Sequence, residues 1–226
     1  MGVITGIVES PKKDGRYVVQ VDGRTFATAS LDILERLQLR VGRPVTESLA
    51  AAIRDAAAAL QTYDRALGLL AFQARSARDL RRRLVQKGEP ESHVDAAIAR
   101  LTASGLLDDA AYARQLARSK VASQGASRRR LQQEMFKRGV AREVGDEAIA
   151  EVFEDELVDE EEVIERVARK KLRSLARLDP DARRRRLYAF LARRGYESDD
   201  IRRAMKRVLD ADEAEAALDA LDEEGE

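Results

Sequence analysis

Apolar residues recur at helical spacing along most of this chain, and one arrangement of them occurs three times. Each copy has two apolar residues four positions apart, then a basic residue and a glycine, then a second apolar pair. The copies are Leu80, Leu84, Lys87, Gly88, Ile98 and Leu101; Leu131, Met135, Arg138, Gly139, Ile149 and Val152; and Leu187, Leu191, Arg194, Gly195, Met205 and Val208. Apolar spacing of three or four predicts amphipathic helices, and a motif that returns after 51 and then 56 residues predicts a tandem array.

Residues that typically begin and end helices stand between these apolar positions. The candidate helix starts are Ser76 with Asp79, Ser127, Asp159 with Glu162, and Asp179 followed by Pro180. The glycine of each copy fits the left-handed residue that ends a helix. An alanine precedes the fifth motif position in every copy, where a small side chain lets two helices approach closely. Each repeat is therefore predicted to contain three helices.

The first 45 residues have a different pattern, which predicts β-structure. The short, partly alternating runs of β-favouring residues are 3–8, 16–21 and 24–29. Asp22-Gly23 joins the last two runs and fits a type I′ hairpin turn, since both central residues of that turn need positive φ. Ser30 fits the cap of a short helix that runs through Leu39. We therefore expect a small three-stranded sheet packed by one helix.

These patterns together predict a mainly α-helical fold that divides into six segments. The segments are a small β-hairpin-containing domain at 1–45, a connecting helix at 46–61, three-helix repeats at 62–109, 110–158 and 159–209, and an acidic tail at 210–226. Because the repeats of an array contact chiefly their neighbours, we expect an elongated molecule that functions through surfaces.

The composition fits many small helix contacts and limits the possible chemistry. Among 226 residues there are five Tyr, five Phe and no Trp or Cys. The absence of Cys excludes disulfides, thiolate nucleophiles and zinc–thiolate sites. No apolar run reaches the roughly 18 to 20 residues of a membrane span, and the N-terminus lacks the layout of a signal peptide. We therefore expect a cytoplasmic protein that does not bind membranes.

Charge is distributed unevenly, although the net formal charge is zero. Residues 210–226 contain nine acidic side chains and no basic ones, so the first 209 residues carry a net charge of +9. Within 163–209, sixteen basic side chains accompany six acidic ones. A cationic body favours a polyanionic partner. The tail is interpreted either as a solvated segment that aids solubility or as a mimic of the polyanion that covers the basic repeats.

Few residues are candidates for catalysis or metal binding. His93 is the single histidine and lies near the start of a predicted helix, which favours an ordinary structural residue over a base or ligand. Asp108 and Asp109 resemble an acid pair, but their position before a helix favours a cap and an acid that complements the helix dipole. Nucleotide-binding, hydrolase and zinc-protease motifs are absent from the sequence. We expect no catalytic residue, no metal and no cofactor.

Clusters of basic residues carry the remaining functional signal. The candidates for contact with DNA or a protein filament are Arg75, Arg78, Arg82, Lys87, Arg128, Arg129, Arg130, Lys137, Arg138, Lys170, Lys171, Arg173, Arg184, Arg185 and Arg194. For any one of them a solvated helix face is the alternative. Residues 128–130 stand out because they follow Ser127 in the first helical turn, where the helix dipole disfavours a cation by roughly 0.3 to 1 kcal/mol. Phosphate oxygens or the carboxylates of a partner would explain them.

Aromatic residues lie among the basic stretches, where they could stack on bases. Phe136 and Phe190 stand beside positions of the apolar stripe, so we expect them in the core. Tyr196 directly follows a glycine stop, so we expect it to be accessible. The basic stretches contain no motif for reading bases, so any nucleic-acid binding is expected to be sequence-tolerant and salt-sensitive.

At this level of detail the chain resembles a known family. The run from Arg75-Ser76 through Asp79-Leu80, Leu84, Lys87-Gly88, Ile98 and Leu101 to Gly105-Leu106-Leu107-Asp108-Asp109 and Tyr112-Ala113 closely resembles the signature of the RecX regulatory proteins, which modulate the RecA recombinase of bacteria. The resemblance is closest over 62–156 and looser over 160–209. The N-terminal Gly2-Val3-Ile4-Thr5 and the following hairpin look like the β-containing extension of some members.

The resemblance implies a fold of three tandem three-helix units that form a curved, elongated molecule. It also implies a non-enzymatic protein that binds RecA filaments on DNA, lodges in the filament groove and modulates ATP hydrolysis and strand exchange. The expected partners are thus the RecA filament and single- or double-stranded DNA, and the protein is expected to be a monomer. Direct, sequence-tolerant DNA binding by a helical repeat protein is the alternative function.

Overall fold

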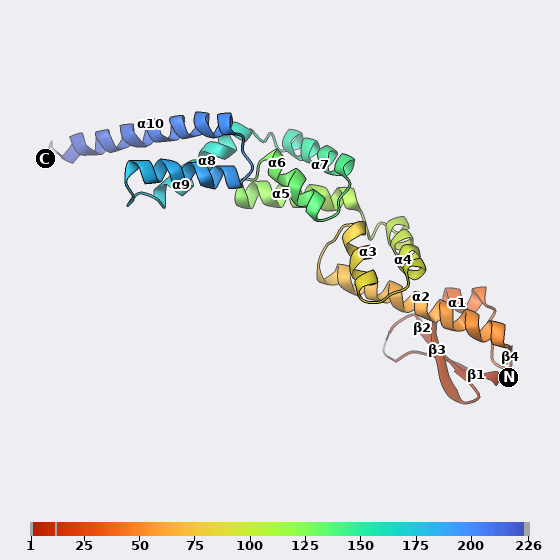
Figure 1. Ribbon diagram of the computed structural model, residues 1–226. Helices are drawn as coiled ribbons and strands as arrows, with labels where there is room; N and C mark the ends of the chain where they lie inside the picture. Colours follow the sequence, from red (N-terminus) through yellow and green to blue (C-terminus); the bar gives the residue numbers. More distant parts are fainter. Residues whose placement is uncertain (1, 12, 224–226) are drawn as a thin grey trace. The chain divides into compact units, whose positions relative to one another are not determined.

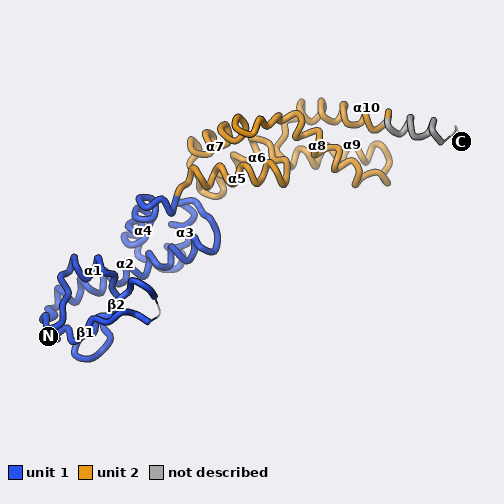
Figure 2. The backbone as a smooth tube through the Cα atoms, turned by 180° about the vertical axis from the view of Figure 1, so that it is seen from behind, with its two compact units in different colours: residues 1–107 blue, residues 108–226 orange. Residues whose placement is uncertain are grey.

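The computed structural model describes the backbone of residues 2–11 and 13–223, and the side chains of these residues up to Asp212 together with Ala214. The chain forms two compact units, Met1–Leu107 and Asp108–Glu226, and each is described by itself (Figure 2). Unit 1 contains the N-terminal sheet and the first three-helix repeat, and unit 2 contains the second and third repeats (Figure 1).

The N-terminal sheet is antiparallel and has four strands in the order β3-β2-β1-β4. The strands are β1 (Gly2–Glu9), β2 (Arg16–Val21), β3 (Arg24–Ser30) and β4 (Pro44–Val45). The predicted hairpin turn between β2 and β3 is confirmed, because Asp22 and Gly23 both have positive φ, 49° and 76°. The prediction of three strands was wrong, since β4 adds a pair of residues beside β1. A strand of two residues is too short to show the alternation by which strands are recognised in a sequence.

Two helices cover this sheet where one was predicted. Ser30 caps α1 (Leu31–Arg36) through Ile33 N–H, as expected, but the helix ends before Leu39. The second helix is α2 (Glu47–Phe72), whose first half contributes Ala50, Ile53 and Leu60 to the core of the sheet. A sheet this small buries little apolar surface alone, so packing against a long helix supplies the rest of its core.

The second half of α2 is the first helix of repeat 1. The other two helices are α3 (Ala77–Gln86) and α4 (Glu91–Ala103). Their core is formed by Leu80, Leu84, Leu101 and Ala66, each fully buried. The limit expected at residues 61 and 62 thus falls inside one unbroken helix that contributes to two cores. The division of the chain into six segments stays a prediction.

Unit 2 repeats the same three-helix arrangement twice. Repeat 2 consists of α5 (Asp109–Gln124), α6 (Arg128–Lys137) and α7 (Arg142–Asp155), and repeat 3 of α8 (Glu160–Arg173), α9 (Pro180–Arg193) and α10 (Ser198–Glu223). Each repeat has its own core, in which the paired apolar residues of the middle helix are at most 2% exposed. The prediction of three three-helix repeats behind a small β segment is confirmed.

The local signals that predicted the helix ends are also confirmed. Gly88, Gly139 and Gly195 have φ between 80° and 87°, and each lies just beyond the middle helix of its repeat. The side chains of Ser76, Ser127, Asp159 and Asp179 accept hydrogen bonds from the backbone of the helices they begin. The alanine before the fifth motif position is buried in every repeat. Most side chains of the acidic tail lie outside the described residues, so both interpretations of the tail stay predictions.

Candidate binding surface on the three-helix units

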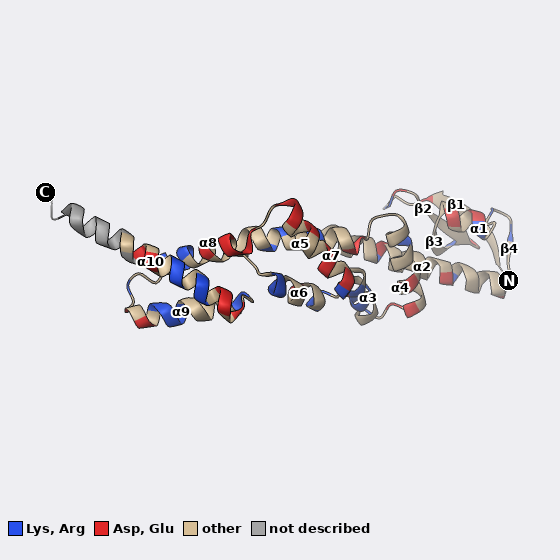
Figure 3. Cartoon of the chain, turned by 90° about the horizontal axis from the view of Figure 1, so that it is seen from above, with Lys and Arg blue, Asp and Glu red and all other residues tan. Residues whose placement is uncertain are grey.

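Most of the basic residues predicted to bind DNA or a filament lie on the surface of the repeats. The exposed ones are Arg78, Arg82, Lys87, Arg128, Arg129, Lys137, Lys170, Arg173, Arg184 and Arg185, and the half-buried ones are Arg130, Arg138, Lys171 and Arg194. In Figure 3 the ribbon is coloured for Lys and Arg along parts of α6, α9 and the first half of α10. Their assignment to a binding surface stays a prediction, but contacts within the chain separate them into different groups.

Arg75 is the exception, because its side chain is only 7% exposed. Its guanidinium donates to the carboxylate of Asp79 at 2.9 Å, and Arg82 and Arg83 bind the same carboxylate. Burial of Asp79 acts to raise the pKa of its carboxyl, but hydrogen bonds from the three arginines outweigh burial and lower it. Arg75 therefore stabilises the start of α3 and is not part of the accessible surface.

The three arginines at the start of α6 have different surroundings. The guanidinium of Arg128 lies 4.0 Å from the centroid of the Phe153 ring, and its backbone N–H donates to Glu160 of α8 at 3.1 Å. Arg130 pairs with Glu134 at 2.8 Å. For these two, carboxylates of the chain itself offset the unfavourable helix dipole. Arg129 is exposed, and no carboxylate among the described residues pairs with it.

Arg129 has an equivalent in each of the other repeats. Two positions before the first buried leucine of the middle helix stand Arg78, Arg129 and Arg185, separated by the repeat offsets of 51 and 56 residues. All three side chains are exposed, and none has a carboxylate partner among the described residues. The equivalence could have been found by aligning the repeats on their leucines and comparing the polar positions.

Repeats 2 and 3 meet at a junction formed by Gly125, Ser127, Arg194, Gly195 and Tyr196. The hydroxyl of Tyr196 donates to the carbonyl of Gly125 at 2.9 Å, and the hydroxyl of Ser127 donates to the carbonyl of Arg194 at 3.1 Å. Tyr196 is 5% exposed, so the expectation that it is accessible was wrong. Burial raises the pKa of its phenol far above the usual range, and the nearby Glu160 acts in the same direction.

Two further aromatic residues differ in their surroundings. Phe136 was expected in the core, but it is 74% exposed on α6, because it points away from the buried Leu131 and Met135. Phe190 packs against the core of repeat 3, as expected. The guanidinium of Arg194 lies 4.5 Å from the centroid of the Phe190 ring, and Lys171 Nζ lies 5.4 Å from it.

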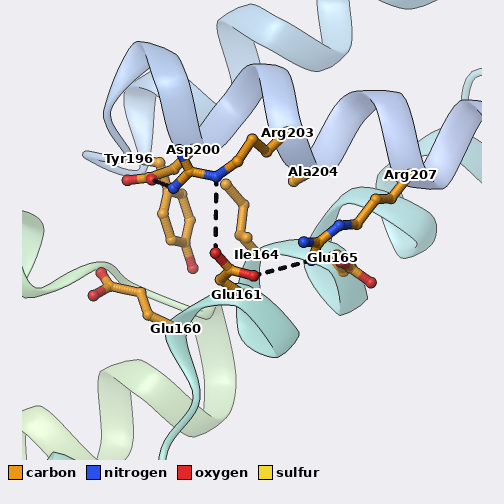
Figure 4. A pocket seen from close by; sticks show the side chains of 9 residues that line it. All are labelled: Glu160, Glu161, Ile164, Glu165, Tyr196, Asp200, Arg203, Ala204 and Arg207. Atoms are coloured by element: carbon orange, nitrogen blue, oxygen red, sulfur yellow. Dashed lines mark hydrogen bonds and ion pairs between the residues drawn. The ribbon is translucent and has the colours of Figure 1, made fainter.

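A pocket of about 180 Å³ between α8 and α10 is lined by more acidic than basic side chains (Figure 4). Glu160, Glu161, Glu165 and Asp200 line it together with two arginines. The guanidinium of Arg207 pairs with Glu161 at 3.0 Å and with Glu165 at 2.9 Å, which joins the two helices. The carboxylates of Glu161 and Glu165 are therefore paired with an arginine of the same repeat. Because its lining has four acidic and two basic side chains, the pocket as a whole would repel phosphate.

The residues considered for catalysis have structural contacts. Asp108 caps α5 by accepting from the N–H of Ala111 at 2.9 Å. His93 Nε2 lies 2.9 Å from a carboxylate oxygen of Asp55 on α2. Among the described residues, His, Asp and Glu side chains form no group of three or more that could hold a metal ion. Within the same residues, no helix is both long and apolar enough to cross a bilayer.

Comparison with known proteins agrees with this arrangement. Models of the first, second and third three-helix domains of RecX match residues 63–101, 108–149 and 159–205, which together make up more than half of the chain. The chain belongs to the RecX family. Each matched RecX domain corresponds to one of the three-helix repeats described above.

Individual RecX proteins show how far the similarity extends. The regulatory protein RecX of Amycolatopsis mediterranei is 38% identical over 128 residues, which are 57% of this chain and 71% of that protein. The regulatory protein RecX of Clostridioides difficile is 23% identical over 94% of this chain and 99% of its own length. A crystal structure of a regulatory protein RecX superposes with a TM-score of 0.73 at 24% identity and covers 93% of this chain and 100% of its own. That structure therefore shares the fold.

Proposed function

We propose that this protein is a non-enzymatic regulator that binds RecA recombinase filaments on DNA and mostly inhibits their ATP hydrolysis and strand exchange. The regulatory role is supported by its relatives, which are named regulatory proteins RecX. In this proposal it acts in the cytoplasm as a monomer, lodges in the filament groove and takes part in recombination, DNA repair and the SOS response.

The arginines Arg78, Arg129 and Arg185 are the observation that carries this proposal. A filament presents the same chemical groups at regular intervals, and a tandem repeat presents the same side chain once per unit. Equivalent contacts that form together add avidity without a deep pocket. Since the guanidinium fork binds both phosphates and carboxylates, these residues suit either the DNA or the protein of a filament.

Direct, sequence-tolerant DNA binding is the second candidate function. It is favoured by the exposed basic residues of α9, a helix that carries Arg184 and Arg185 among five arginines. In that case bare DNA would be bound tightly, with an affinity that falls linearly on a log–log plot against salt concentration. Contact with RecA would then be incidental.

The test replaces the three equivalent arginines together, as Arg78→Ala, Arg129→Ala and Arg185→Ala. A control variant carries Arg24→Ala, Arg36→Ala and Arg40→Ala, which removes the same charge from exposed positions of the N-terminal segment. Inhibition of RecA ATPase on single-stranded DNA is titrated with each protein. At about 0.5 kcal/mol for each lost ion contact, the first variant should need roughly tenfold more protein for the same inhibition.

The result separates the two functions. Equal inhibition by the two variants would remove the equivalent arginines from the mechanism. Binding to bare single-stranded DNA is measured in parallel over a series of salt concentrations. Tight binding of bare DNA with no preference for the filament would favour the second function, whereas weak binding of bare DNA beside strong binding of the filament would favour the first.

A further inference from the structure

A cleft of about 540 Å³ lies in unit 2 between the end of α5 and the helices α8 and α9. Four cationic side chains line it, namely Arg166, Lys170, Lys171 and Arg194. None of the described residues that line the cleft is acidic. Its volume falls within the range of small-molecule sites, which is roughly 300 to 1,000 Å³.

The side chains around the cleft hold two of the cations in place. Arg194 and Lys171 both lie against the ring of Phe190, at 4.5 and 5.4 Å from its centroid. Arg194 is half-buried, and its Nε is enclosed without a hydrogen-bond partner among the described residues. Burial lowers the pKa of this guanidinium, and this effect outweighs that of Tyr196, which acts in the opposite direction. A cation in this environment lacks the counter-charge that buried charges usually have.

Helix dipoles explain part of this arrangement but not all of it. Lys170 and Lys171 stand in the last turn of α8, and Arg194 stands at the end of α9, where positive charge is favourable. Arg166 lies near the middle of α8, where the dipole gives no such advantage. Elsewhere in repeat 3 some arginines have carboxylate partners, as Arg207 has Glu161 and Glu165. The cleft thus brings four cations together, and none of the described side chains that line it is an anion.

We propose that this cleft binds a phosphate group. This inference deepens the proposed function and rests on it for the source of the phosphate, which is then the backbone of a nucleic acid strand. The hydroxyls of Ser123 and Ser174 already donate to the carbonyls of Ser119 and Lys171, so recognition depends on the cations. Because the Phe190 ring is engaged by two cations, it positions charge and does not stack on a base. The site is therefore expected to bind phosphate without regard to sequence.

The test compares two double variants of the full-length protein. The first carries Arg166→Ala and Lys170→Ala, which removes two exposed cations from the cleft and leaves the Phe190 contacts intact. The second carries Arg177→Ala and Lys206→Ala, which removes two exposed cations that do not line the cleft. Two probes are used. Binding of a fluorescent 15-nucleotide oligothymidine is measured directly. Binding of inorganic phosphate, added in a chloride buffer, is measured as an increase in the thermal unfolding temperature of each protein.

We expect the cleft variant, which loses two ion contacts, to bind the oligothymidine roughly fivefold more weakly than the control variant. The slope of log affinity against log salt should decrease by about 1.4, since each phosphate contact to a single strand contributes about 0.7. Stabilisation by inorganic phosphate that the cleft variant loses would show that free phosphate also enters the cleft. A loss confined to the oligothymidine would identify the backbone phosphodiester as the source. Either result supports the inference.

Equal effects of the two double variants, or no effect of the cleft variant on either probe, would overturn the inference. Inhibition of RecA ATPase is measured with the same proteins, so that the two proposals can fail separately. If the wild-type protein does not inhibit RecA while the cleft variant alone loses phosphate binding, the proposed function fails and the cleft stands. If inhibition is present and both variants bind phosphate equally, the cleft fails and the proposed function stands.

Discussion

The junction between repeats 2 and 3 depends on one buried hydroxyl, that of Tyr196. Replacement of Tyr196 by Phe keeps the ring in the core of repeat 3 but removes the donor that the carbonyl of Gly125 accepts from at 2.9 Å. Both residues are buried, so water does not readily replace the lost partner. A buried polar group left without its hydrogen bond costs about 1 to 3 kcal/mol. We therefore expect Tyr196→Phe to lower the free energy of unfolding of unit 2 by about 2 kcal/mol.

Thermal unfolding followed by circular dichroism measures this loss. For a unit of this size, with an entropy of unfolding of about 2.1 cal/mol/K for each residue, about 2 kcal/mol corresponds to a decrease in Tm of roughly 8 °C. The matched control is Tyr188→Phe, because the Tyr188 hydroxyl donates to Ser198 at 3.0 Å at an exposed position. Loss of an exposed hydrogen bond leaves both groups in contact with water, so the control should change Tm little. Equal Tm values for the two variants would refute the junction as described.

The same pair of variants gives a test by pH. Because burial raises the pKa of Tyr196 in the folded protein, the neutral phenol stabilises the fold fully below the unfolded pKa of about 10. This contribution is lost as the pH rises above that value towards the folded pKa. The difference in stability between the wild-type protein and Tyr196→Phe should therefore narrow above pH 10. A constant difference up to strongly alkaline pH would mean that the phenol is accessible in the fold.

Two further predictions concern other structural positions. Gly195→Ala should destabilise the protein more than Gly88→Ala, as measured by urea unfolding. Both glycines have φ above 80°, so the backbone strain is similar. A Cβ at Gly195 would lie 2.8 to 3.0 Å from atoms at the start of α6, whereas a Cβ at Gly88 would have no atom within 4 Å. Equal losses would show that the backbone conformation alone matters. Asp79→Asn should cost about 3 kcal/mol at pH 7, because it leaves a buried arginine unpaired. Because the pKa of Asp79 is lowered in the fold, its carboxylate stabilises the folded protein fully above the unfolded pKa of about 3.9. The difference in stability between Asp79→Asn and the wild-type protein should therefore shrink as the pH falls below about 4. The control is Asp95→Asn, which removes the carboxylate of an exposed ion pair.

The predicted cations show why sequence alone defines a binding surface poorly. The sequence identified the arginines at the start of α6 from an unfavourable helix dipole, and for Arg129, which is exposed, a role in binding stays a prediction. Arg128 at the start of this helix is explained by its contact with Glu160, a partner that the sequence did not reveal because it lies 32 positions away. Arg75 was placed on the surface because it is charged, yet its carboxylate partner buries it. A cation is available to a partner only when its own chain does not satisfy it, and this depends on contacts across the fold.

The apolar positions were more predictable, with failures at the boundaries between elements. All the leucines of the repeated motif are buried, as the helical spacing predicts. The sheet was assigned three strands because β4 has two residues, and its cover was assigned one helix because α2 serves two cores at once. Phe136 stands beside a stripe position but points outward, because neighbouring residues of a helix differ by about 100° in direction.

The sequence by itself determined where the middle helix of each repeat begins and ends and which leucines of the repeated motif enter each core. Caps, left-handed glycines and apolar spacing act over a few residues, so their effect is present in the local sequence. Only the tertiary structure decided which charges remain unpaired, that Tyr196 holds two repeats together, and that Arg166 joins three other cations in one cleft. These outcomes link residues on different helices, up to 71 positions apart, and such contacts exist only once the helices have packed.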